Sequence, residues 1–302
     1  MKQTIFAFTF CLLQSVAFTQ SVIDTSPKKI KILSWNIYML PGIVGNGSMK
    51  IERADAIGQL LASSDYDVII FQEAFCPTAR KKIREHLEAN FPHQAGPANQ
   101  KLFSLKVSSG LWAFSKYPIE ATHSIIYKNR AGVDALSRKG AMLLELNVHG
   151  QLIQVAGTHM QNAGGPAIRH AQCTEFAERL LKPHAKAGVP QILCGDFNIN
   201  KQTQESYQFM LATLAATDGE LQGENKFSYD RLNNDLHVEK GIGQDLIDYI
   251  LVRNNGAWVN CNNRQIKQLR KRWHTNHQDL SDHFSLEAEI VFSPVPAIAS
   301  SK

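Results

Sequence analysis

The apolar positions of this chain alternate between the twofold period of a β-strand and the longer period of an amphipathic helix. In the N-terminal third, two strand-like runs alternate with two helical patterns, at residues 30–35, 51–61, 68–71 and 79–89. The middle of the chain predicts four strands in succession, at 111–115, 120–127, 141–148 and 152–158. A tight His149-Gly150 turn joins the last two of these strands. The pattern therefore predicts a mixed α/β fold.

The C-terminal half continues the alternation with longer polar intervals. Helical patterns at 167–181 and 203–214 flank a short apolar strand at 191–194, and two further strands are predicted at 246–252 and 284–292. Gly, Asn and Asp dominate residues 218–245, which predicts loops. No linker divides the chain, so we expect a single domain of packed sheets and flanking helices over 28–292, with a disordered tail at 293–302.

The first twenty residues have the pattern of an export signal. Lys2 supplies the positive start, residues 5–16 the apolar middle, and Ala17-Phe18-Thr19 a cleavage site of mainly small residues. A retained membrane anchor is the alternative, but the apolar stretch is short for a span and Gln14 and Ser15 interrupt it. No other stretch could cross a bilayer, so we expect residues 1–20 to be removed and the protein to be secreted, either extracellular or periplasmic.

Net charge limits the possible binding partners only slightly, and the cysteines do not define a metal site or a disulfide pairing. A formal net charge of +5 is mild: it suits an anionic phosphate ester or lipid surface without requiring nucleic acid. Outside the export signal the chain has Cys76, Cys173, Cys194 and Cys261. None has the spacing of a zinc site, and the sequence leaves all three disulfide pairings of four cysteines open. Cys194 lies in an apolar run and is expected to be a core residue.

Two short polar motifs suggest the chemistry. Gly195-Asp196-Phe197-Asn198 ends the apolar strand at 191–194, and Ser281-Asp282-His283 precedes the last strand. Asp196 and Asn198 are two positions apart, so an extended backbone would direct them to the same side. A carboxylate, an amide and an imidazole that converge at strand ends indicate metal-assisted hydrolysis of a phosphate ester.

The same placement recurs at other strand ends. Asn36 follows the first predicted strand, Glu73 the second, and His159 the strand at 152–158. One carboxylate after a strand is usually a solvated loop residue, but the repeated placement favours a shared site. Carboxylate and amide oxygens are ligands that suit Mg²⁺, which keeps several waters when it binds to proteins.

Eight segments along the chain resemble motifs of the bacterial neutral sphingomyelinases, a branch of the DNase I-like phosphodiesterase superfamily. They occur in the family's order from about residue 30 to 292: Trp35-Asn36-Ile37-Tyr38-Met39-Leu40, Glu52-Arg53-Ala54-Asp55 with Ile57-Gly58, Gln72-Glu73-Ala74-Phe75, Ser115-Lys116-Tyr117-Pro118-Ile119, Gly157-Thr158-His159-Met160-Gln161, Gly195-Asp196-Phe197-Asn198-Ile199-Asn200-Lys201, Asp248-Tyr249-Ile250 and Ser281-Asp282-His283. The Gly-Asp-x-Asn and Ser-Asp-His pair identifies the superfamily, and the first two segments indicate the sphingomyelinase branch.

The resemblance implies a four-layer α/β/β/α sandwich of two mixed sheets, with the site at the strand ends. By resemblance, Glu73 is the principal ligand of Mg²⁺, with Mn²⁺ or Co²⁺ as substitutes, and Asn36 assists it. His283 is the general base, Asp248 orients it, and Asp282 adjoins the site. Asp196 positions the attacking water, while Asn198 and His159 hold the phosphate. Asp134 and Lys139 resemble a family segment whose lysine reaches the substrate phosphate; without the resemblance they would be an ordinary polar loop.

The activity implied by the resemblance is hydrolysis of sphingomyelin to ceramide and phosphocholine at a phospholipid membrane surface, by a peripheral and monomeric enzyme. A DNase or abasic-site endonuclease is the alternative, but the net charge is modest, the basic cluster is confined to one loop, and nucleic acid is not an expected partner. Inositol polyphosphate phosphatases would have other residues around Asp248. A binding module without activity is disfavoured by the complete polar set.

Two segments near the C-terminus, the basic run from Arg264 to Trp273 and the pair His274 and His277, could be ordinary surface residues or could bind a ligand. The basic residues between Arg264 and Trp273 predict a solvated loop, or alternatively a surface that contacts anionic lipid headgroups. This interval is shorter and more basic than the apolar hairpin of secreted relatives, and the chain lacks cysteines where those relatives form a disulfide near Asp134. His274 and His277 could form a zinc cluster with nearby aspartates, but neither spacing nor a cysteine supports it.

Overall fold

The computed structural model describes residues 26–42, 49–100, 107–132, 137–237 and 243–293. The expected export signal at 1–20, Asp134, and all of the expected tail except Ser293 lie outside the described residues.

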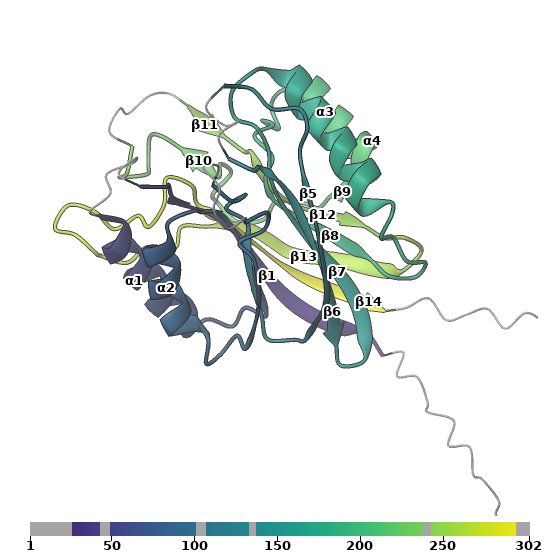
Figure 1. Ribbon diagram of the computed structural model, residues 1–302, viewed down its shortest axis with the longest axis horizontal. Coiled ribbons are helices and arrows are strands. Elements are labelled where there is room, and N and C mark those ends of the chain that lie inside the picture. Colours follow the sequence, from purple (N-terminus) through teal and green to yellow (C-terminus); the bar gives the residue numbers. More distant parts are fainter. Residues whose placement is uncertain (1–25, 43–48, 101–106, 133–136, 238–242, 294–302) are drawn as a thin grey trace, which may run out of the picture.

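The described strands form two six-stranded sheets that pack face to face (Figure 1). The first sheet has the order β13 (Trp258–Lys267), β14 (Ser285–Ser293), β1 (Lys28–Met39), β2 (Val68–Ala74), β4 (Trp112–Ser115) and β3 (His93–Ala95). The second has the order β5 (Ile119–Ile126), β6 (Gly140–Val148), β7 (Gln151–His159), β8 (Gln191–Asp196), β12 (Asp248–Arg253) and β9 (Thr217–Asp218). A separate two-stranded ribbon pairs β10 (Tyr229–Asp230) with β11 (Gln244–Asp245).

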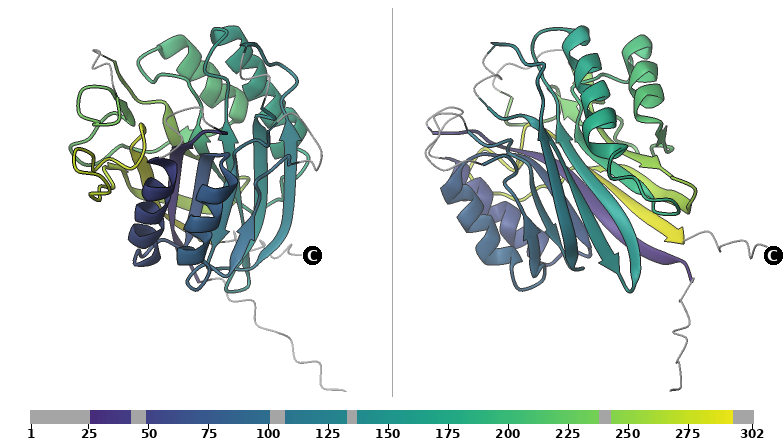
Figure 2. Two further views of the ribbon diagram at one scale, coloured as in Figure 1. Left: turned by 60° about the vertical axis from the view of Figure 1, so that its left-hand side comes forward. Right: turned by 45° about the vertical axis from the view of Figure 1, so that its right-hand side comes forward.

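Helices cover the outer face of each sheet, as the two views of Figure 2 show. Helices α1 (Lys50–Ala62) and α2 (Pro77–Leu87) lie against the first sheet. Helix α3 (Pro166–Phe176), its π-helical extension η3 (Ala177–Leu181) and α4 (Gln204–Leu214) lie against the second. The four-layer α/β/β/α sandwich expected from the sequence is confirmed.

The apolar pattern of the inner strands explains the layers. In β1, Ile30 and Ile32 enter the core between the sheets, whereas Leu33 and Trp35 enter the core beneath α1 and α2. Successive side chains of a strand point to opposite faces, so a strand covered on both faces needs an almost continuous apolar run. β2 follows the same rule, which is why these strands could be predicted from sequence.

Strand pairing brings the polar strand ends together. β1 and β2 are parallel, with Asn36 beside Gln72, and β7 and β8 are parallel, with His159 beside Asp196. β12 runs antiparallel to β8 and places Asp248 directly opposite Asp196. The ends of β7 and β8 and the start of β12 therefore meet at one edge of the second sheet.

Two expectations for the C-terminal half were wrong in part. Residues 218–245 are not all loops, because they supply the end of β9 and the β10–β11 ribbon. The basic segment that starts at Arg264 is not a solvated loop at its beginning, because β13 runs to Lys267 and the Arg264 side chain is buried beside Asp218. A buried arginine needs a carboxylate partner, and the sequence gives no sign of which one it meets.

Cys76, Cys173, Cys194 and Cys261 all lie in the described residues, and none forms a disulfide there. Cys194 is buried in the core, as expected, and burial raises the pKa of its thiol. None of the helices within the described ranges is both long and apolar enough to cross a membrane.

Candidate active site

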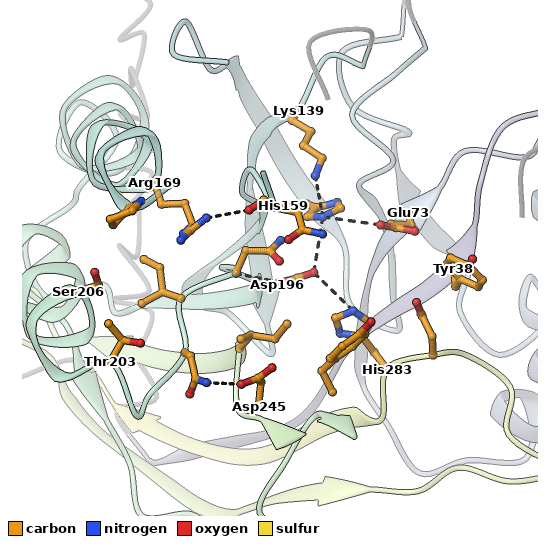
Figure 3. A pocket seen from close by; sticks show the side chains of 18 of the residues that line it. Tyr38, Glu73, Lys139, His159, Arg169, Asp196, Thr203, Ser206, Asp245 and His283 are labelled. Carbon is orange, nitrogen blue, oxygen red and sulfur yellow. Dashed lines mark hydrogen bonds and ion pairs between the residues drawn. The ribbon is translucent and has the colours of Figure 1, made fainter. Parts of the chain in front are cut away.

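A cavity of 520 Å³ opens at the edge where the polar strand ends meet (Figure 3). Most of the residues predicted for the site line it: Glu73, Lys139, His159, Asp196, Asn198, Asp282 and His283. Asn36 and Asp248 are buried directly behind the lining residues, in hydrogen bonds with Asp196 and His283 respectively. Asp134 lies outside the described residues, so the structure does not place it.

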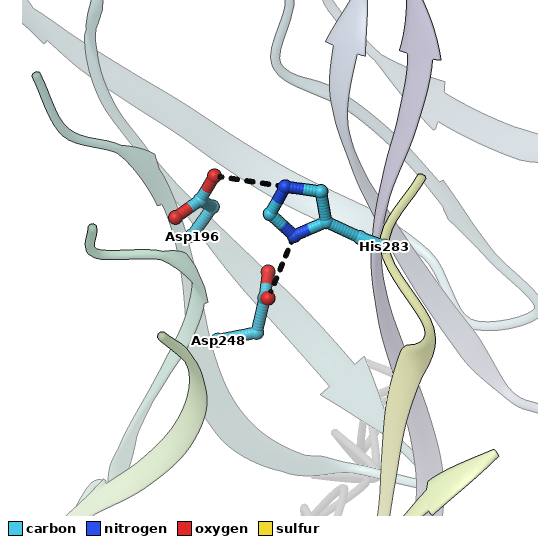
Figure 4. A group of neighbouring side chains, drawn as sticks. All are labelled: Asp196, Asp248 and His283. Carbon is cyan, nitrogen blue, oxygen red and sulfur yellow. Dashed lines mark hydrogen bonds and ion pairs between the residues drawn. The ribbon is translucent and has the colours of Figure 1, made fainter. Parts of the chain in front are cut away.

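His283 and two aspartates form the centre of the site (Figure 4). The Nδ1 atom of His283 lies 2.9 Å from Oδ2 of Asp248, and Nε2 lies 3.9 Å from Oδ2 of Asp196. Burial disfavours the charged imidazole, but the carboxylates, Asp248 above all, outweigh it and raise the pKa of His283 well above its usual value. Burial, together with the charge of Asp248, raises the pKa of Asp196 to about 6. The imidazole thus has one nitrogen fixed by Asp248 and the other facing the cavity.

The opposite wall of the cavity holds a second histidine in a different state. Burial, with the charge of Lys139 next, lowers the pKa of His159 well below its usual value. Because His159 is neutral, its Nε2 can accept a hydrogen bond from Nζ of Lys139 at 3.1 Å. Nζ also donates to the carbonyl of Met160 at 3.2 Å, and Nδ2 of Asn198 donates to the same carbonyl at 3.1 Å. Cationic and amide groups therefore line one side of the cavity together.

Glu73 has the properties of a ligand for a hard divalent cation. Its Oε2 atom is buried and has no hydrogen-bond partner among the described residues. Burial, followed by the charge of Asp282, raises the pKa of Glu73 to about 7. A buried carboxylate oxygen without a donor, beside a second carboxylate, fits Mg²⁺, which takes oxygen ligands.

Asn36 is less directly placed for this role. Its Nδ2 atom donates to Asp196 at 3.1 Å, and its Oδ1 atom accepts from the backbone N–H of Tyr38 at 3.2 Å. One lone pair of Oδ1 remains for a cation, since a carbonyl oxygen has two. The amide of Asn36 therefore fits an assisting ligand that also orients Asp196.

Unusual backbone conformations hold the lining residues in place. Tyr38, Glu73 and Asn198 have φ of 52°, 56° and 52°, which is the left-handed region that residues with side chains rarely adopt. Such strain is commonly retained at functional sites because the surrounding structure imposes it. Beside them, Gly195 has φ of 141°, and a Cβ atom there would lie 2.0 Å from the carbonyl oxygen of Thr158. The β7–β8 approach that delivers Asp196 thus requires glycine.

Several lining residues were not predicted from sequence. Arg169 comes from the first turn of α3, and Tyr229 and Asp245 come from the β10–β11 ribbon. The hydrogen bonds of Arg169 all use Nη1, and no carboxylate in the described ranges lies within ion-pair distance of its guanidinium. None of these residues follows an apolar β run, and the sequence prediction relied on polar residues that follow such runs.

Outside the cavity, the segment at 270–280 folds back on the protein. The Trp273 ring stacks on His277 at 5.4 Å, and its Nε1 donates to the carbonyl of Asp279 at 2.8 Å. Trp273 therefore packs on the α1 and α2 side of the core instead of presenting its whole ring to an interface. Neither His274 nor His277 belongs to a metal-type cluster within the described residues.

Known proteins similar to this chain share most of its length. A curated "Phospholipase C" of Staphylococcus aureus is 26% identical over 288 residues, which is 86% of either chain. A "Sphingomyelinase C" of Listeria ivanovii is 25% identical over 290 residues, again 86% of each. The crystal structure of a beta toxin from Staphylococcus aureus is 25% identical, with a TM-score of 0.77 over 86% of this chain and 99% of that one.

More distant structures have the same fold. D. rerio TDP2, solved with a single-strand DNA product, is 15% identical with a TM-score of 0.67, and the match covers 87% of this chain and 98% of that chain. The sequence model of the Endonuclease/Exonuclease/phosphatase family matches residues 33–283, an interval that contains the strand ends from Asn36 to His283. The chain belongs to the Endonuclease/Exonuclease/phosphatase family and is a phosphodiesterase of that group.

Proposed function

We propose that this chain is an exported, Mg²⁺-dependent phosphodiesterase that hydrolyses sphingomyelin to ceramide and phosphocholine. The observation that supports the reaction most is the arrangement of His283 between Asp248 and Asp196, facing Glu73 across one cavity. The relatives named sphingomyelinase C support the substrate, and a beta toxin variant solved with bound magnesium ions supports the cation.

In this mechanism His283 is the general base. Its Nδ1–H donates to Asp248, which leaves Nε2 as the atom that takes a proton from the attacking water. Asp196, next to Nε2, accepts the second hydrogen of that water and so directs its oxygen toward phosphorus. The proton taken up by Nε2 creates an imidazolium that the buried carboxylate of Asp248 stabilises.

The opposite wall holds the phosphoryl group. Asn198 and Lys139 donate hydrogen bonds to the non-bridging oxygens. His159, which the resemblance assigns to the phosphate itself, acts on it through the Lys139 ammonium that its Nε2 holds in place. Glu73 and Asn36 would hold Mg²⁺ on the same side of the cavity. When bound, Mg²⁺ supplies positive charge to the phosphoryl oxygens and to the departing alkoxide.

The remaining expectations belong to this proposal as well. Residues 28–292 form the catalytic domain, residues 1–20 direct export, and the enzyme acts as a monomer at the membrane surface. Lys271 and Arg272 follow β13 on a partly exposed segment, and their charges suit anionic headgroups. Contact with lipid would then be peripheral and mainly electrostatic.

One assay separates the proposal from its alternatives. Purified protein without residues 1–20 is tested on sphingomyelin, phosphatidylcholine, plasmid DNA and an inositol polyphosphate, each with Mg²⁺ and with a chelator. We expect Mg²⁺-dependent release of phosphocholine from sphingomyelin. Nicking of DNA without release of phosphocholine would reject the lipid substrate and favour a nuclease.

Two variants test the roles of single residues. His283→Ala should lower turnover by roughly 10⁴-fold with little change in folding, because a general base and its pairing with Asp248 are both lost. His274→Ala, a histidine outside the cavity, is the control and should keep full activity. Glu73→Ala should raise the Mg²⁺ concentration needed for half-maximal activity; an unchanged Mg²⁺ response would remove Glu73 from the cation site.

A further inference from the structure

Asp245 is a carboxylate that lines the cavity and forms no ion pair with another described residue. It lines the same cavity as Asp196 and His283 but lies at its lower end in Figure 3, below Asp196. One of its oxygens accepts a hydrogen bond from Nδ2 of Asn200. No lysine or arginine among the described residues lies within ion-pair distance of it, and burial alone raises its pKa. An anionic group that is partly removed from water and has no cationic partner among the described residues favours the binding of a cation.

The β10–β11 ribbon places an aromatic ring beside this carboxylate. Tyr229 and Asp245 are direct partners across the two antiparallel strands, so their side chains lie on the same face of the ribbon. That face lines the cavity, because both residues do. The other pair of the ribbon, Asp230 and Gln244, has its own hydrogen bond at 3.1 Å. The ribbon therefore presents one carboxylate and one aromatic ring to the cavity.

This pair lies next to the group that performs the chemistry. The Tyr229 ring centroid is 5.0 Å from that of His283, with a tilt of 57°. Tyr229 also forms an isolated β-bridge with His283, which fixes the ribbon against the start of β14. If the phosphorus of a substrate lies next to His283, a group esterified to that phosphate would thus be within reach of Tyr229 and Asp245.

The lining around Asp245 distinguishes between kinds of cation. Ile199, Ile247 and Tyr229 line the cavity, so apolar and aromatic side chains are present there together with the polar Asn200, Thr203 and Ser206. A small divalent cation needs several oxygen ligands, whereas Tyr229, Ile199 and Ile247 offer no carboxylate or side-chain carbonyl oxygen beside Asp245. A large, weakly hydrated organic cation is favoured instead by one carboxylate, an aromatic face and apolar walls, as in known sites for quaternary ammonium groups.

We propose that Asp245 and Tyr229, with Ile247 beside them, form a subsite for the quaternary ammonium of a phosphocholine headgroup. This inference rests on the proposed function, since it assigns the recognition of the headgroup to the same cavity. The phosphate lies between His283 and Glu73, and the choline extends from it toward the β10–β11 ribbon. The ceramide side then leaves the cavity in another direction, toward the membrane surface.

The test compares two substrates that differ only in charge. One is the p-nitrophenyl ester of phosphocholine, and the other is its carbon isostere, in which a tert-butyl group replaces the trimethylammonium group. Wild-type protein should have the higher kcat/KM on the choline ester. Asp245→Asn, which keeps the shape and removes the charge, should reduce this preference by roughly tenfold while kcat/KM on the isostere stays within about twofold. Glu220→Gln removes an exposed carboxylate outside the cavity and should leave both rates unchanged.

A second pair of variants tests the aromatic face. Tyr229→Phe keeps the ring and should retain the preference for the choline ester, whereas Tyr229→Leu should lose it. Tetramethylammonium gives a second readout, because it has the charge of the choline group but no phosphate. It should inhibit wild-type hydrolysis of the choline ester competitively, and it should inhibit Asp245→Asn at least several-fold more weakly.

The outcomes separate this inference from the function on which it rests. If wild type cleaves phosphocholine esters and Asp245→Asn changes neither rate, or lowers both rates equally, the subsite is wrong and the proposed function stands. An increased Mg²⁺ requirement in Asp245→Asn, with the preference intact, would assign Asp245 to a metal and overturn the subsite. If wild type cleaves DNA but no phosphocholine ester, both proposals fail.

Discussion

Asp248→Asn tests the catalytic arrangement most directly, because it removes one charge and almost no volume. Asp248 and His283 are 2% and 7% exposed, and their Oδ2 and Nδ1 atoms are 2.9 Å apart. The asparagine amide can occupy the same space, but it cannot stabilise an imidazolium as a carboxylate does. It also allows the other tautomer of His283, in which Nε2 carries the proton and cannot act as a base.

The size of the effect follows from the distance and the burial. At 2.9 Å, two unit charges attract by about 6 kcal/mol at an effective dielectric constant of about 20, before desolvation is subtracted. Loss of one partner of a buried pair usually costs about 3–5 kcal/mol. On the high-pH plateau His283 starts neutral and becomes charged only when it takes the proton from water, so most of this cost falls on the transition state. Since about 1.4 kcal/mol is a factor of ten in rate, kcat should fall by about 10²- to 10⁴-fold.

The pH profile gives a second, independent readout. Asp248 raises the pKa of His283, and the base works only when it is neutral, so wild-type activity rises as the pH increases through that raised pKa. In Asp248→Asn the pKa of His283 should fall. The acid limb of the kcat/KM profile should therefore move to lower pH, although the plateau is lower.

Asp218→Asn is the matched control for this experiment. Asp218 is also 2% exposed and lies 2.6 Å from Arg264, but it is not in the cavity. Its substitution should lower the free energy of unfolding and leave the acid limb where it is. The assignment of His283 as the base oriented by Asp248 is refuted if the Asp248→Asn plateau remains within threefold of wild type, or if the acid limb does not move.

Three further predictions concern other parts of the site and its support. In denaturant titrations, Gly195→Ala should lower the free energy of unfolding by about 3 kcal/mol or more, because the new Cβ would lie 2.0 Å from the Thr158 oxygen. A loss below about 1 kcal/mol would show that β7 and β8 can separate without cost. Glu175 accepts hydrogen bonds from the backbone N–H groups after β5, and these lower the pKa of Glu175 although burial opposes this. Glu175→Gln should therefore lower the free energy of unfolding by about 1–3 kcal/mol at neutral pH. The difference should shrink as the pH falls through the lowered pKa of Glu175 in the folded state, and a difference independent of pH would contradict this. Lys139→Met should reduce kcat/KM by roughly 10²-fold and leave the Mg²⁺ requirement unchanged. If Lys139 only supported His159, which it contacts, the variant would instead be less stable and turn over normally.

The main elements of the fold could be predicted from the chain because they depend on local apolar patterns. β1 and β2 are covered on both faces, and their almost continuous apolar runs are visible in any window of a few residues. β13 was missed because its side chains alternate between half-buried and exposed, with Asn and Gln at several positions. Its place in the sheet depends on pairing with β14, which is a contact between distant segments.

The polar ends of the apolar strands were also determined by sequence alone. Asn36, Glu73, His159 and Asp196 end or follow apolar runs, and the structure places each at or directly behind the cavity. A strand end is a local feature, and the ends of parallel strands necessarily lie at one edge of a sheet. Residue type and position were therefore enough to predict that Asn36 lies near Glu73 and His159 near Asp196. That the two pairs share one cavity depends on how the two sheets pack.

Only the tertiary structure decided how those groups act. The pairing of Asp248 with His283 depends on strand order, because β12 must lie beside β8 while β14 lies in the facing sheet. The opposite pKa shifts of His159 and His283 arise from what surrounds each imidazole in space and have no counterpart in the sequence. Likewise, Asp245 lies within a polar stretch that looks like a loop, and it reaches the cavity only because the β10–β11 ribbon pairs it with Tyr229.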